Sequence, residues 1–249
     1  MALPALVLLH GGGLAADSWE LTVDEIHRQA PELTVLAVDM PGRRDKSGEL
    51  IGARIDDWVD SVVSDVETAG IDTLVIAGHS MAGVIVPGVV EKLGSSRVRE
   101  MILAAAYVPP DGAALVDTLP GLLGWYARRS SKRNEHRGKS GTLPTAWASY
   151  VFCNGMTRAQ RNFMLERLYP ESPSIVLDTV DRIGMPEDIP RTWIMTRRDR
   201  ALPIKSQQRS IDAIGGVQTL IPIDTCHILM VSEPTRLAEI LVERCRLYA

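Results

Sequence analysis

Apolar and polar positions alternate along this chain in blocks: short, almost wholly apolar runs are separated by longer stretches of helical periodicity. The short runs predict strands at residues 6–9, 33–38, 73–77, 98–106, 192–196 and 219–223. The longer stretches predict helices, the clearest at residues 55–69, 81–93 and 237–247. Continuous runs of Val, Ile, Leu and Ala are typical of strands buried on both faces. The pattern therefore predicts an α/β fold with a mostly parallel, doubly wound sheet.

The alternation stops between residues 108 and 189. This stretch holds several prolines and aromatic residues, and a basic run at residues 128–139. We interpret it as a helical cap insertion above the carboxyl edge of the sheet, with residues 1–107 and 190–249 forming the core domain. The basic run is too short and too mixed with small polar residues to indicate nucleic-acid binding, and we expect it to be a solvated loop.

Composition narrows the class of protein. The chain has 249 residues, is 45% hydrophobic and carries a net charge of −4, which fits one domain with its own core and no nucleic-acid partner. Its three cysteines are widely spaced and indicate neither a disulfide framework nor a zinc site, so we expect a cytoplasmic protein. No stretch approaches the roughly 18 apolar residues of a membrane span, and the apolar start predicts a buried strand rather than a signal peptide.

One stretch combines a strand, a sharp turn and a helix around a serine. The strand at 73–77 leads into Gly78-His79-Ser80-Met81-Ala82, and a helix is predicted to follow. A tight turn of this kind pushes the serine hydroxyl out above the sheet, and it needs small residues two before and two after the serine. Gly78 and Ala82 meet this need, although glycine is usual at the second place and here follows one residue later. Ser80 is therefore the predicted nucleophile.

A serine that attacks a carbonyl needs backbone N–H groups to hold the oxyanion. His10 is followed by three glycines directly after the first predicted strand, and glycines let the backbone approach a substrate oxygen. We expect the N–H groups of Gly12 and Met81 to be the two donors. The glycine run lacks the spacing of a phosphate-binding loop, so nucleotide binding is not indicated.

A serine hydroxyl also needs a base to take its proton. His227 follows the last predicted strand, which places it at the same sheet edge as Ser80, because the carboxyl ends of parallel strands share one side. The other four histidines have other interpretations. His10 belongs to the oxyanion loop and His79 to the serine turn, whereas His27 is expected at an exposed helical position and His136 in the basic run.

The base needs an acid to orient it. Asp199 follows the predicted strand at 192–196, and the order Ser80, Asp199, His227 is the order expected for a serine turn of this type. Asp111 is the alternative acid, since it follows the preceding strand. Asp224 is close to His227 in sequence but is expected in the turn at the end of its strand.

Together these residues resemble the α/β-hydrolase superfamily, and within it the branch that contains plant methylesterases, hydroxynitrile lyases and related bacterial esterases. The chain starts at the oxyanion strand, and its segment Asp199-x-x-x-Pro203 is similar to the acid segment of that branch. Residues 150–157 and 167–170 are similar to the cap motif of the bacterial esterases. The resemblance implies an α/β-hydrolase fold with a helical cap over nearly the whole chain, residues 112–145 excepted.

The resemblance also helps to choose between two chemistries. The lyases carry a lysine directly after the catalytic histidine, where this chain has Ile228, and tend to carry threonine where it has Gly11. The resemblance therefore implies hydrolysis of an ester or lactone. The alternatives are a hydroxynitrile-lyase-like enzyme and a biosynthetic tailoring enzyme, such as a cyclase or lactone-forming enzyme, that uses the same triad. A further alternative is a non-catalytic binding protein on this fold. Such a protein usually lacks a triad member, whereas this chain keeps Ser80, Asp199 and His227.

The mechanism needs no metal or cofactor, and the expected partner is a small-molecule substrate with an aromatic or acyl group. The predicted substrate contacts are one glycine beside the serine turn and four aromatic residues, namely Gly11, Trp19, Trp125, Trp147 and Phe152. Members of that branch are often dimeric, so the resemblance is also compatible with a homodimer.

Overall fold

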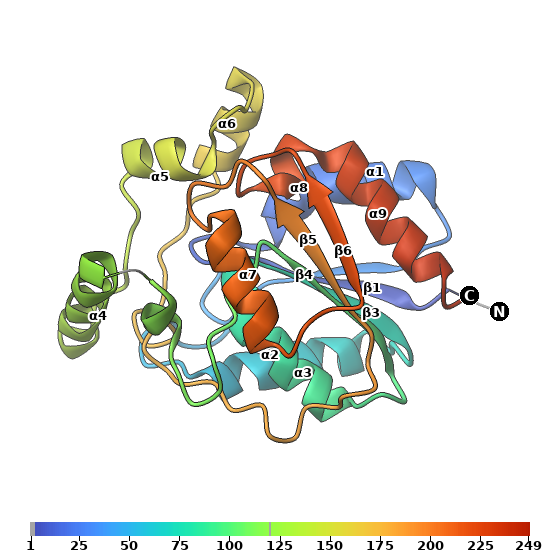
Figure 1. The fold of residues 1–249 in the computed structure, drawn as a ribbon, viewed down its shortest axis with the longest axis horizontal. Helices are drawn as coiled ribbons and strands as arrows, with labels where there is room; N and C mark the ends of the chain where they lie inside the picture. Colours follow the sequence, from blue (N-terminus) through green and yellow to red (C-terminus); the bar gives the residue numbers. More distant parts are fainter. Residues whose placement is uncertain (1–2, 120) are drawn as a thin grey trace.

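Six parallel strands form one sheet in the order β2-β1-β3-β4-β5-β6 in a computed structural model that describes residues 3–119 and 121–249 (Figure 1). The strands are β1 (Ala5–Leu9), β2 (Val35–Val38), β3 (Leu74–His79), β4 (Val98–Ala104), β5 (Arg191–Thr196) and β6 (Thr219–Ile223). The chain winds from β1 out to β2 and then returns to β3 on the other side of β1. The strand order therefore reverses between β1 and β3, and ligands of open α/β sheets bind where that reversal occurs.

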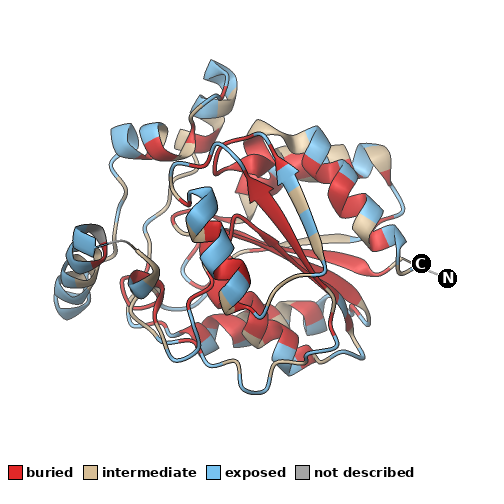
Figure 2. Ribbon diagram, viewed as in Figure 1, coloured by how far each residue is buried: buried red, intermediate tan, exposed pale blue. Residues whose placement is uncertain are grey.

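Side chains from one strand pack alternately into two cores, one on each face of the sheet. Val7 and Leu9 of β1 point into the core beneath helices α2 (Ile55–Thr68), α3 (Val86–Leu93) and α7 (Ile204–Ala213). Leu6 and Leu8 point into the core beneath α1 (Glu20–Gln29) and α9 (Pro234–Arg246). Figure 2 shows the buried strands between these two layers of helices. The doubly wound parallel sheet predicted from the sequence is thus confirmed.

Some elements differ from the prediction. The helix expected at 81–93 is divided into a 3₁₀ turn, η2 (Ser80–Val84), and α3, because Pro87 has no N–H and belongs in the first turn of a helix. Helices α1 and α7 were not among the predicted helices; α1 buries only Thr22 and Ile26, and α7 buries Gln207, Ser210 and Ile211. Among the described residues, no helix is both long and apolar enough to cross a membrane.

Residues 108–189 contain a 3₁₀ turn and three helices, which are η3 (Leu115–Thr118), α4 (Gly121–His136), α5 (Thr145–Phe152) and α6 (Arg158–Leu165). The irregular stretch at 166–190 contains four prolines and no helix, because proline removes a backbone donor. The expectation of a loop for the basic run was wrong for most of its length. Residues 128–136 lie in α4, since arginine and lysine are good helix formers and the exposed helix keeps their charges in water (Figure 2).

Candidate active site

The backbone of Ser80 is strained where β3 ends and η2 begins. Its φ is +53°, in the left-handed region that costs a residue with a side chain about 1–3 kcal/mol. A Cβ built on Gly78 would lie 2.5 Å from Cγ2 of Val86, and one on Gly83 would overlap the carbonyl oxygen of Tyr107. Small residues are therefore required on both sides of this turn. Gly83 takes the close approach, which leaves room for the methyl group of Ala82.

The structure brings the three predicted triad residues together. Nε2 of His227 lies 2.8 Å from Oγ of Ser80, and Nδ1 of His227 lies 2.7 Å from Oδ2 of Asp199. The three residues come from the ends of β3, β5 and β6, so the shared carboxyl edge of the sheet assembles them. The imidazole of His227 is almost wholly buried, and Ser80 is only 7% exposed. This is the geometry of a nucleophile, its base and an orienting acid.

Asp199 accepts hydrogen bonds at both carboxylate oxygens. Oδ2 accepts from Oγ1 of Thr196 at 2.7 Å as well as from His227, and Oδ1 accepts from the N–H groups of Ala201 and Leu202 at 2.8 and 2.7 Å. Burial acts to raise the pKa of the carboxyl group, but His227 and these donors outweigh it, so the pKa of Asp199 lies below its ordinary value. Asp199 is therefore ionised at neutral pH, as a partner of a developing imidazolium must be.

The two expected oxyanion donors lie next to each other. Gly12 follows β1, Met81 follows Ser80, and a Cβ built on Gly12 would lie 3.6 Å from Cβ of Met81. The N–H of Met81 lies in the first turn of η2, where a helix has no internal acceptor for it. Gly11 lies against Ser80, since a Cβ built there would be 2.8 Å from Cβ of Ser80. The loop after β1 and the turn after β3 thus meet where the strand order reverses.

Two buried histidines support this edge and stay neutral. Burial lowers the pKa of His10 and of His79 to about 3 in each case. His10 accepts a hydrogen bond from the N–H of Met40 at Nε2 (3.2 Å) and donates from Nδ1 to the carbonyl of Gly11 (2.9 Å). His79 donates from Nε2 to the carbonyl oxygen of His227 at 2.9 Å. Each imidazole therefore fixes a backbone segment that carries a site residue.

The predicted substrate contacts are distributed unequally. Phe152 stacks on His227 with ring centroids 5.3 Å apart, and Trp147 meets Phe152 edge-on at 5.8 Å. Trp19 is buried in the core beneath α1. Trp125 is 62% exposed on α4, with the guanidinium of Arg129 over its ring, and α4 stands apart from the edge that carries the triad (Figure 1). The structure therefore places Phe152 against His227 and Trp147 against Phe152, whereas Trp19 is packed in the core and Trp125 is exposed on α4.

The two alternative acids lie away from His227. Oδ1 of Asp111 accepts from the N–H of Arg182, and Asp224 forms an exposed ion pair with Arg198. Sequence reasoning missed two supporting residues. Thr196 donates to Asp199, and the buried Gln207 donates to the carbonyl oxygens of Thr196 and of Leu202 in the acid loop. A polar residue at the end of a buried strand was the only signal for Thr196, and nothing local marked Gln207.

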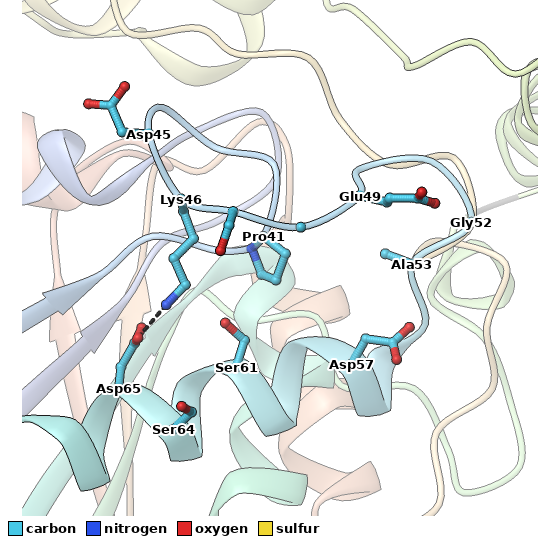
Figure 3. A pocket seen from close by; sticks show the side chains of 12 residues that line it. Pro41, Asp45, Lys46, Glu49, Gly52, Ala53, Asp57, Ser61, Ser64 and Asp65 are labelled. Carbon is cyan, nitrogen blue, oxygen red and sulfur yellow. Dashed lines mark hydrogen bonds and ion pairs between the residues drawn. The ribbon is translucent and has the colours of Figure 1, made fainter.

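A separate hollow lies between the loop at 41–53 and helix α2 (Figure 3). Its lining is polar, and the ammonium of Lys46 pairs with Asp65 across it. The residues drawn there are Pro41, Asp45, Lys46, Ser47, Gly48, Glu49, Gly52, Ala53, Asp57, Ser61, Ser64 and Asp65. None of these residues belongs to the triad. Over residues 3–119 and 121–249, no three His, Cys, Asp or Glu side chains gather in a way that could hold a metal ion.

Two curated proteins are similar to part of the chain. An (E)-2-((N-methylformamido)methylene)succinate hydrolase from Acinetobacter baylyi is 32% identical over 84 residues, which cover 34% of this chain and 31% of the relative. The dihydrolipoyllysine-residue acetyltransferase component of the acetoin cleaving system from Cupriavidus necator is 30% identical over 107 residues, 43% of this chain and 26% of the relative. The chain thus spans less than a third of the length of either relative.

Solved structures are similar over nearly the whole chain. An extracellular α/β-hydrolase from a Paenibacillus species, described as sharing structural and functional homology with tobacco salicylic acid binding protein 2, has a TM-score of 0.83 and 22% identity and covers 96% of this chain and 98% of its own. A methylesterase from Arabidopsis has a TM-score of 0.76 and 16% identity, with 98% and 100% covered. Polyneuridine aldehyde esterase has a TM-score of 0.75 and 16% identity, with 97% and 99% covered.

These structures include esterases of the branch that the sequence resembles, and at such identities the likeness shows a shared fold. A family model matches residues 6–240, nearly the whole chain, and its description is the alpha/beta hydrolase family. The match covers the strands that carry Ser80, Asp199 and His227. The chain belongs to the α/β hydrolase family.

Proposed function

We propose that this α/β hydrolase is a serine hydrolase that cleaves a carboxylic ester or lactone of a small, largely apolar substrate through an acyl-enzyme on Ser80. The observation that carries the proposal is the unbroken line of hydrogen bonds from Asp199 through His227 to Ser80, at 2.7 and 2.8 Å. A buried, ionised carboxylate at the end of this line holds the imidazole with its Nε2 lone pair toward the serine hydroxyl.

The reaction proceeds in two halves. Ser80 attacks the carbonyl carbon while its hydroxyl proton passes to Nε2 of His227, and the tetrahedral oxyanion is held by the N–H groups of Gly12 and Met81. His227 then gives this proton to the leaving alkoxide, which leaves an ester on Ser80. Water, deprotonated by the same histidine, attacks that ester. The bond between the acyl carbon and Oγ of Ser80 then breaks, His227 returns the proton to Oγ, and the acid is released. In a lactone the alcohol remains covalently part of the acyl group throughout, so the second half releases a single hydroxy acid.

The surroundings of the triad favour this chemistry. Asp199 is ionised and buried, so it stabilises the imidazolium that forms at each proton transfer. The oxyanion donors are backbone groups held at the ends of β1 and β3, and one such donor typically lowers the barrier by about 3 kcal/mol. Because water is largely excluded around Ser80, these electrostatic interactions are stronger than they would be in solvent.

The substrate class follows from the wall beside the nucleophile. Phe152 covers one face of the His227 ring, and Trp147 extends the same apolar surface. Because Ser80 is only 7% exposed, residues 108–189 act in this proposal as a cap that has to move to admit the acyl or aromatic group of the substrate. The related solved structures include a methylesterase and polyneuridine aldehyde esterase, whose names agree with an ester substrate here.

A cyanohydrin lyase is the main competitor for the same triad. Ile228, directly after His227, is buried and offers no charge to a leaving cyanide ion. Gly11 has no room for a larger side chain beside Ser80, since its Cβ position already lies 2.8 Å from Cβ of that residue. Both observations favour hydrolysis over the lyase reaction.

The test is turnover of p-nitrophenyl acetate, p-nitrophenyl butyrate, an aromatic methyl ester, a γ-lactone and mandelonitrile by the wild type, Ser80→Ala and Ser18→Ala. Ser18 is a matched control, because it is also buried and its hydroxyl donates to a backbone carbonyl outside the triad. We expect ester or lactone hydrolysis that Ser80→Ala abolishes and Ser18→Ala retains. Mandelonitrile cleavage without hydrolysis of any ester or lactone would replace this proposal with the lyase.

A further inference from the structure

The cap segment around residues 169–171 binds both backbone groups of Gly13, in the oxyanion loop. The N–H of Gly13 donates to Oε2 of Glu171 at 2.7 Å, and the carbonyl oxygen of Gly13 accepts from the N–H of Tyr169 at 2.8 Å. The Tyr169 hydroxyl also donates to Asp17, just beyond the loop, at 2.6 Å. Residues more than 150 positions apart in sequence thus hold the oxyanion loop and the cap together.

The contact with Glu171 selects one orientation of a peptide group. The N–H of Leu14 donates to the carbonyl oxygen of Gly11, which closes a four-residue turn, and Gly13 has φ +68° in its third place, as in a type II turn. Type I and type II turns differ by a flip of their central peptide, here the one between Gly12 and Gly13. A carboxylate that accepts the Gly13 N–H holds this peptide in the type II orientation and so fixes the backbone that presents the Gly12 donor.

Glu171 is itself held firmly. Its backbone pairs with Gly141 through two hydrogen bonds of 2.7 and 2.8 Å, and its Oε1 accepts from the N–H of Ser172 at 2.6 Å. Oε1 also accepts from the buried guanidinium of Arg43 at 2.6 Å, whose Nε donates to the carbonyl oxygen of Leu14 at 3.0 Å. Arg43 therefore ties Glu171 to the far end of the same turn.

The charge of Glu171 matters as well as its position. A Cβ built on Gly12 would lie 3.3 Å from Oε2 of Glu171, so the carboxylate lies beside the residue expected to hold the oxyanion. An uncompensated negative charge there would oppose the charge that develops in the transition state, and the side chain is too buried for water to screen it well. The guanidinium of Arg43 neutralises the carboxylate while leaving its hydrogen bond to Gly13 intact.

We propose that Glu171 is a positioning residue that locks the oxyanion turn from the cap side, and that Arg43 is the counter-charge that makes a carboxylate tolerable at this place. The inference rests on the proposed function, because it concerns the oxyanion site of the same reaction. In this proposal the Arg43–Glu171 pair attaches the cap to the core and also raises the rate of the chemical step.

The first test compares Glu171→Ala with Glu171→Gln, because glutamine keeps an oxygen that can accept the Gly13 N–H. We expect Glu171→Ala to lose kcat on the order of 10²-fold with little change in KM, since a small misplacement of a donor costs that much. Glu171→Gln should recover most of that loss. The matched controls are Glu166→Ala and Glu166→Gln, because Glu166 is an exposed glutamate of the same cap segment. Both control variants should have the kcat of the wild type. Equal losses in both Glu171 variants would overturn the positioning role.

The second test separates charge from structure. Arg43→Met leaves Glu171 unpaired, and we expect a kcat below that of Glu171→Gln. Adding Glu171→Gln to Arg43→Met should then raise kcat at least several-fold, because the opposing charge is gone. A purely structural pair would give a double variant no faster than Arg43→Met, and that result would overturn the charge role. Thermal melts accompany each assay; should Arg43→Met fail to fold, the neutral Arg43→Gln replaces it, and adding Glu171→Gln to Arg43→Gln should raise kcat in the same way.

Wild-type turnover keeps this inference distinct from the proposed function. A wild type that hydrolyses no ester or lactone overturns the proposed function and the inference that rests on it. An active wild type in which Glu171→Ala keeps its full kcat overturns only the inference.

Discussion

The ring of Phe152 lies stacked on the imidazole of His227, with centroids 5.3 Å apart and planes inclined by 25°. Phe152 is the last residue of α5, so this helix ends directly on the proposed catalytic base. Tyr107 lies edge-on to the same imidazole at 6.5 Å, and His79 lies tilted to it at 4.8 Å. The base is therefore enclosed by rings, and its hydrogen bonds to Ser80 and Asp199 are its main polar contacts.

Removing this ring should impair the reaction more than binding. We expect Phe152→Ala to lower kcat roughly tenfold with a smaller change in KM, because the imidazole gains freedom and water enters beside it, and Phe152→Leu to lose less kcat. Steady-state kinetics on p-nitrophenyl butyrate measure both. Tyr150→Ala is the control, since Tyr150 belongs to the same helix and is 66% exposed. Equal kinetics for Phe152→Ala and Tyr150→Ala would contradict a role for the stacking.

The hydroxyl of Thr196 should matter through Asp199. Thr196→Val keeps the shape and removes a hydrogen bond of 2.7 Å, which should weaken the support of Asp199 and lower kcat by about threefold to tenfold, equivalent to the loss of about 1 kcal/mol. Thr22→Val is a matched control: Thr22 is also fully buried, and its hydroxyl donates to the carbonyl of Met230, outside the triad. Both variants should lose a similar amount of unfolding free energy, but only Thr196→Val should lose kcat.

Gly11 should tolerate no side chain. A Cβ there would lie 2.8 Å from both Cβ of Ser80 and Nδ1 of His79, so Gly11→Ala must displace the nucleophile, and we expect kcat to fall on the order of 10²-fold. Gly184→Ala is the control, since the atoms nearest to a Cβ at Gly184 all belong to the flexible side chain of Glu91. Hydrolysis rates and thermal melts of both variants check this, and full activity in Gly11→Ala would show that the oxyanion loop has more room than the structure gives it.

The protein should lose stability in mild acid because of His10 and His79. Burial lowers both pKa values to about 3, whereas an unfolded histidine titrates near pH 6.5. Above pH 6.5 both states hold the rings neutral, and the stability is fully present. As the pH falls below 6.5, the unfolded state takes up protons that the folded state refuses. The free energy of unfolding should therefore drop by about 1.4 kcal/mol per pH unit for each histidine.

Urea unfolding between pH 7 and pH 5 measures this slope. His79→Gln should reduce this slope by about 1.4 kcal/mol per pH unit, which is the contribution of one histidine. His27→Gln should leave the slope unchanged, since His27 is exposed. A wild type whose unfolding free energy is constant over this range would show that both rings gain a proton in the folded state as readily as in the unfolded state.

Much of the fold could be predicted because its signals are local. Each strand is a continuous apolar run, and the turn at Ser80 needs small neighbours whatever lies around it. Parallel strands share a carboxyl edge, so residues that follow β3, β5 and β6 were expected to meet, and the structure places Ser80, Asp199 and His227 within hydrogen-bonding distance. Position after a strand therefore carried more information than the residue type alone.

The cap was less predictable because its contacts are made by single residues far apart in the sequence. Glu171 lies 128 positions from Arg43 and 158 from Gly13, and nothing near any of them signals the contact. The basic run was expected as a loop because its charges suggested solvent, yet an exposed helix satisfies the same charges. Trp125 was expected to contact the substrate because it is aromatic. It lies on the exposed surface of α4, where the guanidinium of Arg129 covers its ring.

The most direct measurement is the pre-steady-state release of p-nitrophenol from p-nitrophenyl acetate by the wild type and by Ser80→Ala, with peptide mass mapping of the quenched, digested protein. An acyl-enzyme on Ser80 predicts a burst close to one equivalent per wild-type chain, an added acetyl mass on the peptide that contains Ser80, and neither signal in Ser80→Ala. A burst of the same size in Ser80→Ala, or an acetyl group on another residue of the wild type, would contradict the assignment of Ser80 as the nucleophile.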